Sequence, residues 1–360
     1  MAERQRIDRF LKLMNDRGAS DLHFSVGRPP MLRVGGHIEQ IRYRTVKEGD
    51  LTDLLKPITP PARWQDFLDS GDADFSYQVE EIGRFRVNLF KQRRGSGAVF
   101  RIIPTNIMTI EQLGLPTQLR KLASIRHGLV IVTGPTGSGK STTLAAIIDL
   151  LNETRGYHIV TIEDPIEFVH PNKKCLIHQR EIGTHAPSFS EALRAAGRED
   201  PDVILVGELR DLETISMALS AAERGTIVFA TLHTNNAIKT VDRIVSVFPA
   251  GEQEGARNVL AEGLQGVVAQ QLLPKVGGGR VAAVEIVFAS AAISNLIRRG
   301  KVGQITSLIQ GGVKQGMIDM DASIRQLYED GLVTARSAYD KAIDKELFKD
   351  IMDEATGTVG

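Results

Sequence analysis

The stretch that decides the fold of this chain is Gly134-Pro135-Thr136-Gly137-Ser138-Gly139-Lys140-Ser141-Thr142. It directly follows the apolar run Leu-Val-Ile-Val at residues 129–132 and directly precedes Thr-Leu-Ala-Ala-Ile-Ile at residues 143–148. The apolar run is typical of a buried strand, and the second segment favours a helix. The order is therefore strand, glycine-rich loop and helix, which predicts an α/β fold around this point.

The loop has the spacing of a phosphate-binding loop, with Gly, four residues, Gly, Lys and Ser. Glycines let successive backbone N–H groups converge on phosphate oxygens, and the positive end of the helix dipole points at the same anion. We expect Lys140 to reach the β- and γ-phosphates and the Ser141 hydroxyl to ligate Mg²⁺. A plain turn between strand and helix is the disfavoured alternative. The residues predicted to bind the nucleoside triphosphate are Gly134, Thr136, Gly137, Ser138, Gly139, Lys140, Ser141 and Thr142.

Composition limits the class of protein. The chain has 360 residues, enough for two domains, with 42% hydrophobic and 24% charged residues. Lys plus Arg (44) balances Asp plus Glu (44), which removes the electrostatic argument for nucleic acid as the main partner. The single cysteine, Cys175, cannot supply a four-cysteine zinc site. No signal peptide or membrane-spanning run is recognisable, so we expect a cytoplasmic protein.

The N-terminal part, residues 1–104, predicts an α+β domain, followed by a linker at residues 105–126. Residues 84–90 alternate strictly, which places Phe85 and its apolar neighbours on one face of a strand and the arginines on the other. Two interpretations of the arginine face stay open. It is a solvated polar face, or Arg86 and Arg101 reach a phosphate bound to a neighbouring subunit, as arginine fingers do.

Residues 127–290 predict an ATPase domain, because strands and helices alternate as a parallel sheet requires. Residues 291–360 predict a C-terminal helical region. Four strands are expected after the phosphate loop, at residues 158–162, 203–206, 226–230 and 281–288. Helices are expected between them, at residues 188–196, 212–223, 237–247 and 253–272.

Functional side chains follow three of these strands directly. Glu208 has the placement of a Walker-B acid, which holds Mg²⁺ or its water shell, so the predicted metal ligands are Ser141 and Glu208. Glu163 is a candidate general base for the attacking water. His233 is placed to donate to the γ-phosphate. Which of the two glutamates is the base stays open.

Several segments beyond the loop resemble the secretion ATPase superfamily, and most closely the type IV pilus retraction ATPases of the PilT family. The resemblance implies a RecA-like ATPase domain, a PAS-like N-terminal domain and a homo-hexameric ring. It also implies that nucleotide lies between one subunit and the next, which favours Arg86 and Arg101 as arginine fingers. The segments are Ser-Asp-Leu-His at 20–23, Arg-Phe-Arg-Val-Asn at 84–88, Thr-Ile-Glu-Asp-Pro-Ile-Glu at 161–167, the acidic stretch 200–211, and Ala-Thr-Leu-His-Thr-Asn at 230–235.

The function that this resemblance implies is Mg²⁺-dependent ATP hydrolysis by a motor that powers pilus retraction and twitching motility. The expected partners are an inner-membrane pilus platform protein, at which the ring is peripherally bound, and a paralogous retraction ATPase. Residues 292–299 depart from the usual C-terminal motif of the family at Ser294 and Arg299. This departure motivates an alternative, a nucleotide-gated accessory ring with little turnover of its own. A DNA-handling RecA-like ATPase is a third alternative, which the balanced charge disfavours.

Overall fold

The computed structural model describes residues 6–80, 82–103 and 106–356, which form two compact units. Unit 1 contains the chain up to Asn106 together with two later segments, Asp164–Val169 and Arg180–Pro187. Unit 2 contains Ile107–Glu163, His170–Gln179 and the chain from Ser188 onward. Pro104 and Thr105, where we predicted the N-terminal domain to meet the linker, lie outside the described residues.

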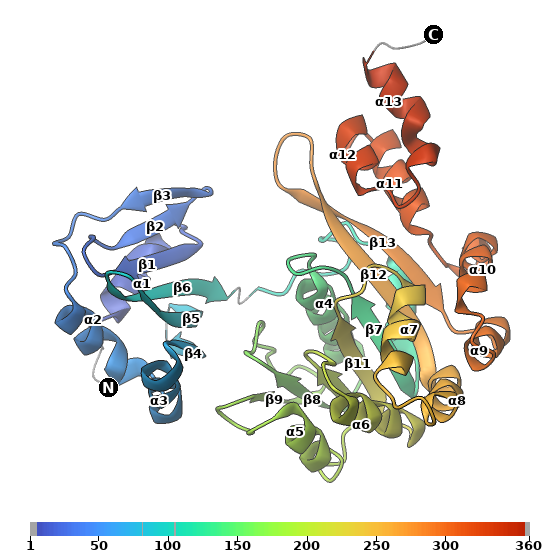
Figure 1. Cartoon of the computed structure of the whole chain (residues 1–360), viewed down its shortest axis with the longest axis horizontal. Coiled ribbons are helices and arrows are strands. Elements are labelled where there is room, and N and C mark those ends of the chain that lie inside the picture. The colour runs from blue at the N-terminus through green and yellow to red at the C-terminus, as the bar shows by residue number, and fades with distance from the viewer. Residues whose placement is uncertain (1–5, 81, 104–105, 357–360) are drawn as a thin grey trace. The chain divides into compact units, whose positions relative to one another are not determined.

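Unit 1 is built on a six-stranded antiparallel sheet with the strand order β3-β2-β1-β6-β5-β4 (Figure 1). Helices α1, α2 and α3 contact β1, β6 and β4, respectively. This arrangement confirms the predicted α+β character. The strands are β1 (Asp21–Ser25), β2 (Met31–Val34), β3 (His37–Gln40), β4 (Asp72–Val79), β5 (Gly83–Gln92) and β6 (Gly95–Ile103). The helices are α1 (Asp8–Asp16), α2 (Glu48–Leu55) and α3 (Pro61–Ser70), with a 3₁₀ turn η1 (Lys56–Ile58).

The alternation predicted for residues 84–90 is confirmed in β5. Phe85, Val87 and Leu89 are fully buried in the core of unit 1. Arg86 lies on the opposite face and is paired in register with Arg101 of β6. The apolar face therefore anchors both strands, so that their arginines are carried at fixed positions of the sheet.

Unit 2 is built on a seven-stranded sheet with the order β13-β12-β7-β11-β10-β8-β9 (Figure 1). Strands β12, β7, β11, β10 and β8 are parallel, and β13 pairs antiparallel with β12. The predicted α/β fold with a parallel sheet is thus confirmed. The strands are β7 (Gly128–Thr133), β8 (His158–Glu163), β9 (Leu176–Glu181), β10 (Val203–Val206), β11 (Ile227–Leu232), β12 (Leu264–Pro274) and β13 (Arg280–Phe288).

Helices cover this sheet, and three of them, α11, α12 and α13, pack with β12 and β13 (Figure 1). Val130 and Val132 of β7 pack in one cluster with Leu144 and Ile147 of α4. None of the helices described is long and apolar enough to cross a membrane. The helices are α4 (Lys140–Thr154), α5 (Phe189–Ala196), α6 (Leu212–Glu223), α7 (Ala237–Ser246), α8 (Gln253–Gly263), α9 (Ala291–Arg298), α10 (Ile305–Gly311), α11 (Met320–Glu329), α12 (Ala335–Lys341) and α13 (Lys349–Thr356). The 3₁₀ segments are η2 (Thr117–Ser124), η3 (Val302–Gln304), η4 (Val313–Gln315) and η5 (Lys345–Phe348).

The predicted helix over residues 253–272 is wrong in its second half. Helix α8 ends at Gly263, and β12 begins at Leu264, whose backbone is extended. Two β-branched residues, Val267 and Val268, then pair with β7 and are buried on both faces of the sheet. Strand β9 was also not predicted, because its polar sequence from Leu176 lacks the apolar run of the other strands.

Candidate nucleotide-binding site

The phosphate loop connects the end of β7 to the first turn of α4, as predicted. Gly139 precedes α4 with a φ of +89°, a left-handed conformation that favours glycine, and no side chain caps the helix. The first N–H groups of α4 are therefore available to an anion. Thr136 and Gly137 are exposed at the tip of the loop, and Ser141 and Thr142 are half-buried in the first turn of α4.

Lys140 is held at the inner side of the loop. The residue is only 8% exposed, and Nζ donates to the carbonyl oxygens of Gly134 at 2.8 Å and Pro135 at 3.1 Å. The side chain therefore curls back over its own loop, which places the positive charge where the backbone N–H groups converge.

His233 links the loop to Glu208. Its Nδ1 lies 3.5 Å from Lys140 Nζ, and its Nε2 lies 3.1 Å from Glu208 Oε1. An ammonium group only donates hydrogen bonds, so the first contact is a hydrogen bond when Nδ1 carries a lone pair. Arg210 Nε donates to the other carboxylate oxygen of Glu208 at 2.7 Å. The structure thus brings together three of the predicted residues, Lys140, His233 and Glu208.

Glu163 lies on the neighbouring strand but makes different contacts. Strands β8 and β10 pair up to Ile162 and Val206, and Gly207 N donates to Ile162 O at 2.7 Å. A Cβ on Gly207 would lie 3.3 Å from the Cα of Glu163, so the two strand ends touch at this glycine. The Glu163 carboxylate accepts hydrogen bonds from Thr161 Oγ1 at 2.6 Å and Gln179 Nε2 at 3.3 Å.

The segment after β11 is fixed at both of its ends. Thr234 N donates to Thr133 Oγ1 at 2.9 Å, which ties the segment to the last residue of β7. Ala237 N, at the start of α7, donates to the buried carboxylate of Glu285 at 2.7 Å. His233 therefore extends from a backbone that is anchored to the same strand as the phosphate loop.

Sequence reasoning missed Gln270, which lies on β12 beside the phosphate loop. The side chain is buried, and Nε2 donates to Ser138 O at 2.7 Å while Oε1 accepts from Thr143 Oγ1 at 2.7 Å. The erroneous helix over 253–272 concealed this residue. The pair Val267-Val268, three and two residues before it, was the available signal for a strand.

The two candidate arginine fingers belong to unit 1. Arg101 Nε donates to Asp21 Oδ1 at 2.7 Å, and its side chain is 68% exposed. Arg86 Nε lies 3.8 Å from Asp74 Oδ1 and is also exposed. Burial acts to raise the pKa of Asp21, but hydrogen bonds from Ser20 and Arg101 outweigh it and hold that pKa below its ordinary value. Both arginines are thus presented on one exposed face of the sheet of unit 1.

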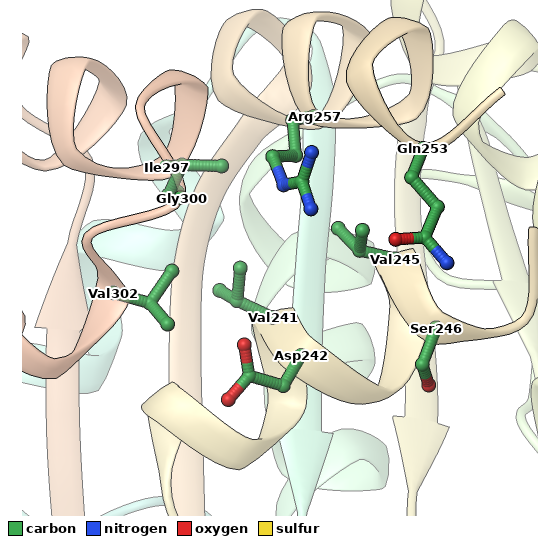
Figure 2. Close-up of a pocket in the computed structure, with 9 residues that line it drawn as sticks. All are labelled: Val241, Asp242, Val245, Ser246, Gln253, Arg257, Ile297, Gly300 and Val302. Atoms are coloured by element: carbon green, nitrogen blue, oxygen red, sulfur yellow. The ribbon is translucent and has the colours of Figure 1, made fainter. Parts of the chain in front are cut away.

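A pocket of about 210 Å³ lies elsewhere in unit 2, between α7, α8 and the end of α9 (Figure 2). Arg257 of α8 points into it from one side, and Asp242 of α7 lies on the other. None of the predicted site residues lines this pocket.

Comparison with known proteins gives a family match over most of the chain. The family model described as "Type II/IV secretion system protein" matches residues 5–329. PilT of Pseudomonas aeruginosa, named a "type IV pilus retractation ATPase", is 51% identical over 342 residues, which cover 95% of this chain and 99% of the relative. A "twitching motility protein" of Neisseria gonorrhoeae is 49% identical over 318 residues, covering 88% of this chain and 85% of the relative.

A solved structure is similar in three dimensions. The crystal structure described as the pilus retraction motor PilT with bound ADP superposes with a TM-score of 0.88 at 45% sequence identity. The superposition covers 96% of this chain and 99% of that one. The likeness therefore extends through both units.

Proposed function

This chain belongs to the type II/IV secretion system protein family and is an ATPase, and from this premise we propose that it powers the retraction of a type IV pilus. Relatives named for retraction and for twitching motility support this assignment. The observation that carries the chemical part of the proposal is the linked set Lys140, His233 and Glu208.

The phosphate loop binds the triphosphate of ATP in this proposal. The uncapped N–H groups of α4 and the Lys140 ammonium face the phosphate oxygens and neutralise their charge. Ser141 and Glu208 would hold Mg²⁺, because a hydroxyl and a carboxylate are the hard oxygen donors that this cation prefers. When bound, Mg²⁺ would stabilise the negative charge that develops on the phosphates.

The strand ends supply the residues for hydrolysis. Glu163 orients the attacking water and takes its proton, since its carboxylate is held in place by Thr161 and Gln179. Glu208 is the alternative base, and its carboxylate is held in place by the hydrogen bond from Arg210 Nε. His233 contacts both Lys140 and Glu208, so it is placed to sense whether the γ-phosphate is present.

Six copies form a ring in this proposal, and Arg86 and Arg101 of one subunit complete the site of the next. The exposure of both arginines in unit 1 supports this role, because a finger must leave its own subunit to reach a neighbour's nucleotide. The ring works peripherally at an inner-membrane platform protein, beside a paralogous retraction ATPase.

The test is ATP turnover by the purified protein. We expect Lys140→Ala to lower turnover by about 10²-fold or more, the scale of losing one group that stabilises transition-state charge. Lys275→Ala, which removes an exposed lysine of the β12–β13 turn, is the matched control and should hydrolyse ATP like the wild type. Equal background turnover in all three proteins would refute the proposal.

A cellular assay separates the motor from the accessory ring. In cells that lack other retraction ATPases, the wild type should restore retraction and Lys140→Ala should not. Robust turnover in vitro without restored retraction would leave an ATPase with a different mechanical role.

A further inference from the structure

Gln270 contacts the phosphate loop from the neighbouring strand. Strand β12 runs parallel to β7, with Ala269 in register with Thr133, the last residue of β7. Gln270 therefore lies beside Gly134, where the loop begins. A Cβ on Gly134 would lie 2.1 Å from Gln270 O, so the loop passes directly against this backbone.

The side chain of Gln270 then bridges the other end of the loop. Its amide nitrogen donates to Ser138 O and its amide oxygen accepts from Thr143 Oγ1, both at 2.7 Å. A Cβ on Gly139 would lie 2.8 Å from the same amide nitrogen, so only glycine leaves room for the bridge. One buried amide thus ties the last residues of the loop to the first turn of α4.

The bridge fixes the direction of a peptide plane. In a trans peptide the C=O of one residue and the N–H of the next point in opposite directions. Because Ser138 O is directed to Gln270, the N–H of Gly139 points away from β12. A loop that binds phosphate needs its N–H groups turned to the anion before the ligand arrives, since ordering them on binding lowers affinity.

We propose that Gln270 is a positioning residue, which holds the phosphate loop in its nucleotide-binding conformation by orienting the peptide between Ser138 and Gly139. The inference rests on the ATP binding that the proposed function requires. The amide supplies a donor and an acceptor side by side, which neither Leu nor an ionised Glu does. A glutamate would turn a carboxylate oxygen toward the Ser138 carbonyl oxygen and bury a negative charge beside an anion site.

The test measures the affinity for ADP by calorimetry, together with kcat and KM for ATP. Gln270→Leu should weaken ADP binding by about 30-fold through the loss of two buried hydrogen bonds, and KM should rise with it. Gln270→Glu should weaken binding further. Gln271→Leu and Gln271→Glu are the controls, because Gln271 lies on the same strand and donates instead to Lys341 O at 3.1 Å. Both controls should stay within about twofold of the wild type.

A second pair of variants keeps the test decisive if Gln270 variants unfold. Thr143→Val removes the hydroxyl at the other end of the bridge and should weaken ADP binding, whereas Thr143→Ser should restore most of the loss. In the double variant with Gln270→Leu, the two effects should be less than additive. Wild-type affinity in Gln270→Leu, or equal losses in Gln271→Leu, would overturn the proposal. Failure of the wild type to bind ADP would instead refute the proposed function.

Discussion

The phosphate loop of unit 2 and the arginine strands of unit 1 hold their cations in opposite ways. Lys140 is 8% exposed and is bonded to the carbonyl oxygens of its own loop. Arg101 is 68% exposed at the side chain and bonded to Asp21. The first cation is fixed by the fold of its own unit, and the second is exposed while its partner Asp21 is buried.

This difference bears on how the proposed site between subunits would be assembled. A group that is ordered before binding costs little when the ligand arrives, whereas an exposed ion pair such as Arg86–Asp74 is weak and is easily replaced. The loop is thus prepared for nucleotide within one chain, and the arginines are prepared to change contacts. The predictions that follow test this contrast, first at the site and then among the buried carboxylates of the two units.

The largest expected effect comes from the arginines. Arg101→Ala and Arg86→Ala should lower turnover by about 10³-fold, the lower end for an arginine finger, while ADP affinity changes little. Turnover and calorimetric binding measure the two quantities separately. Arg33→Ala on β2, whose guanidinium lies 3.6 Å from Asp21, is the control and should keep most of the activity.

Mixtures of two variants test the proposed ring, in which the arginines act on a neighbouring subunit. Lys140→Ala subunits keep both arginines, and Arg101→Ala subunits keep the phosphate loop. Mixing the two inactive proteins should therefore recover turnover. No recovery in rings that demonstrably contain both variants would contradict action on a neighbouring subunit.

A smaller effect is expected at Glu181 of unit 1. Its buried carboxylate accepts from Arg84 at 2.6 Å and from Ser76 at 2.8 Å. Burial acts to raise the pKa of Glu181, but hydrogen bonds from Ser76, Ile166 N and Arg84 outweigh it and the pKa is lowered. A carboxyl group with a lowered pKa stabilises the fold at pH values above the ordinary carboxyl pKa. This stabilisation is lost as the pH falls through the lowered pKa.

Glu181→Gln should therefore lower the free energy of unfolding of unit 1 by about 3 kcal/mol at pH 7, because a buried cation loses its partner. The difference should shrink below about pH 4. Trp64, the single tryptophan, lies on α3 and reports on unit 1 by its fluorescence in denaturant. Glu39→Gln, at an exposed position of β3, should change little. A difference in the free energy of unfolding that does not change with pH would contradict the lowered pKa of Glu181.

An effect of the opposite sign is expected at Glu285 of unit 2. Burial raises its pKa to about 7, and the negative charges of Asp319 and Asp321 add to this, while the hydrogen bond from Ala237 N acts against it. A carboxyl group with a raised pKa contributes its full stabilisation at low pH. This contribution is lost as the pH rises through 7.

Glu285→Gln keeps an acceptor for Ala237 N but cannot ionise. It should therefore be more stable than the wild type by about 3 kcal/mol at pH 8.5, since the pKa rises from 4.5 to about 7 and each pKa unit corresponds to about 1.4 kcal/mol. Near pH 4 the two proteins should unfold alike. Thermal unfolding followed by circular dichroism measures the difference, and Glu223→Gln at an exposed position of α6 is the control. Equal stability across the range would contradict the raised pKa.

The parts of the site that the sequence predicted are those encoded by neighbouring residues. The phosphate loop follows its strand directly, and Glu163, Glu208 and His233 follow theirs, so local patterns suffice to locate them. The contacts that join Lys140, His233 and Glu208 depend on the order of strands in the sheet, which no local pattern contains.

The parts that escaped prediction depend on distant residues. Gln270 is 132 positions from Ser138 in the chain, and only the pairing of β12 with β7 brings them together. The segment before it has good helix formers up to Gly263, which outweighed the signal of Val267 and Val268. Tertiary pairing decided the conformation of β12, as it often does for strands.

The chain returns to unit 1 at Asp164 and again at Arg180. This limits which parts of its gene could be exchanged with those of relatives by recombination. A crossover after Asn106 would transfer all six strands of the sheet of unit 1 but leave Glu181 behind, and Arg84 would arrive without its carboxylate. A crossover after Pro187 would keep that pair but divide the sheet of unit 2, because β8 and β9 would move and β10 would not. Neither half is a transferable module, so the two units are expected to have been inherited as one piece.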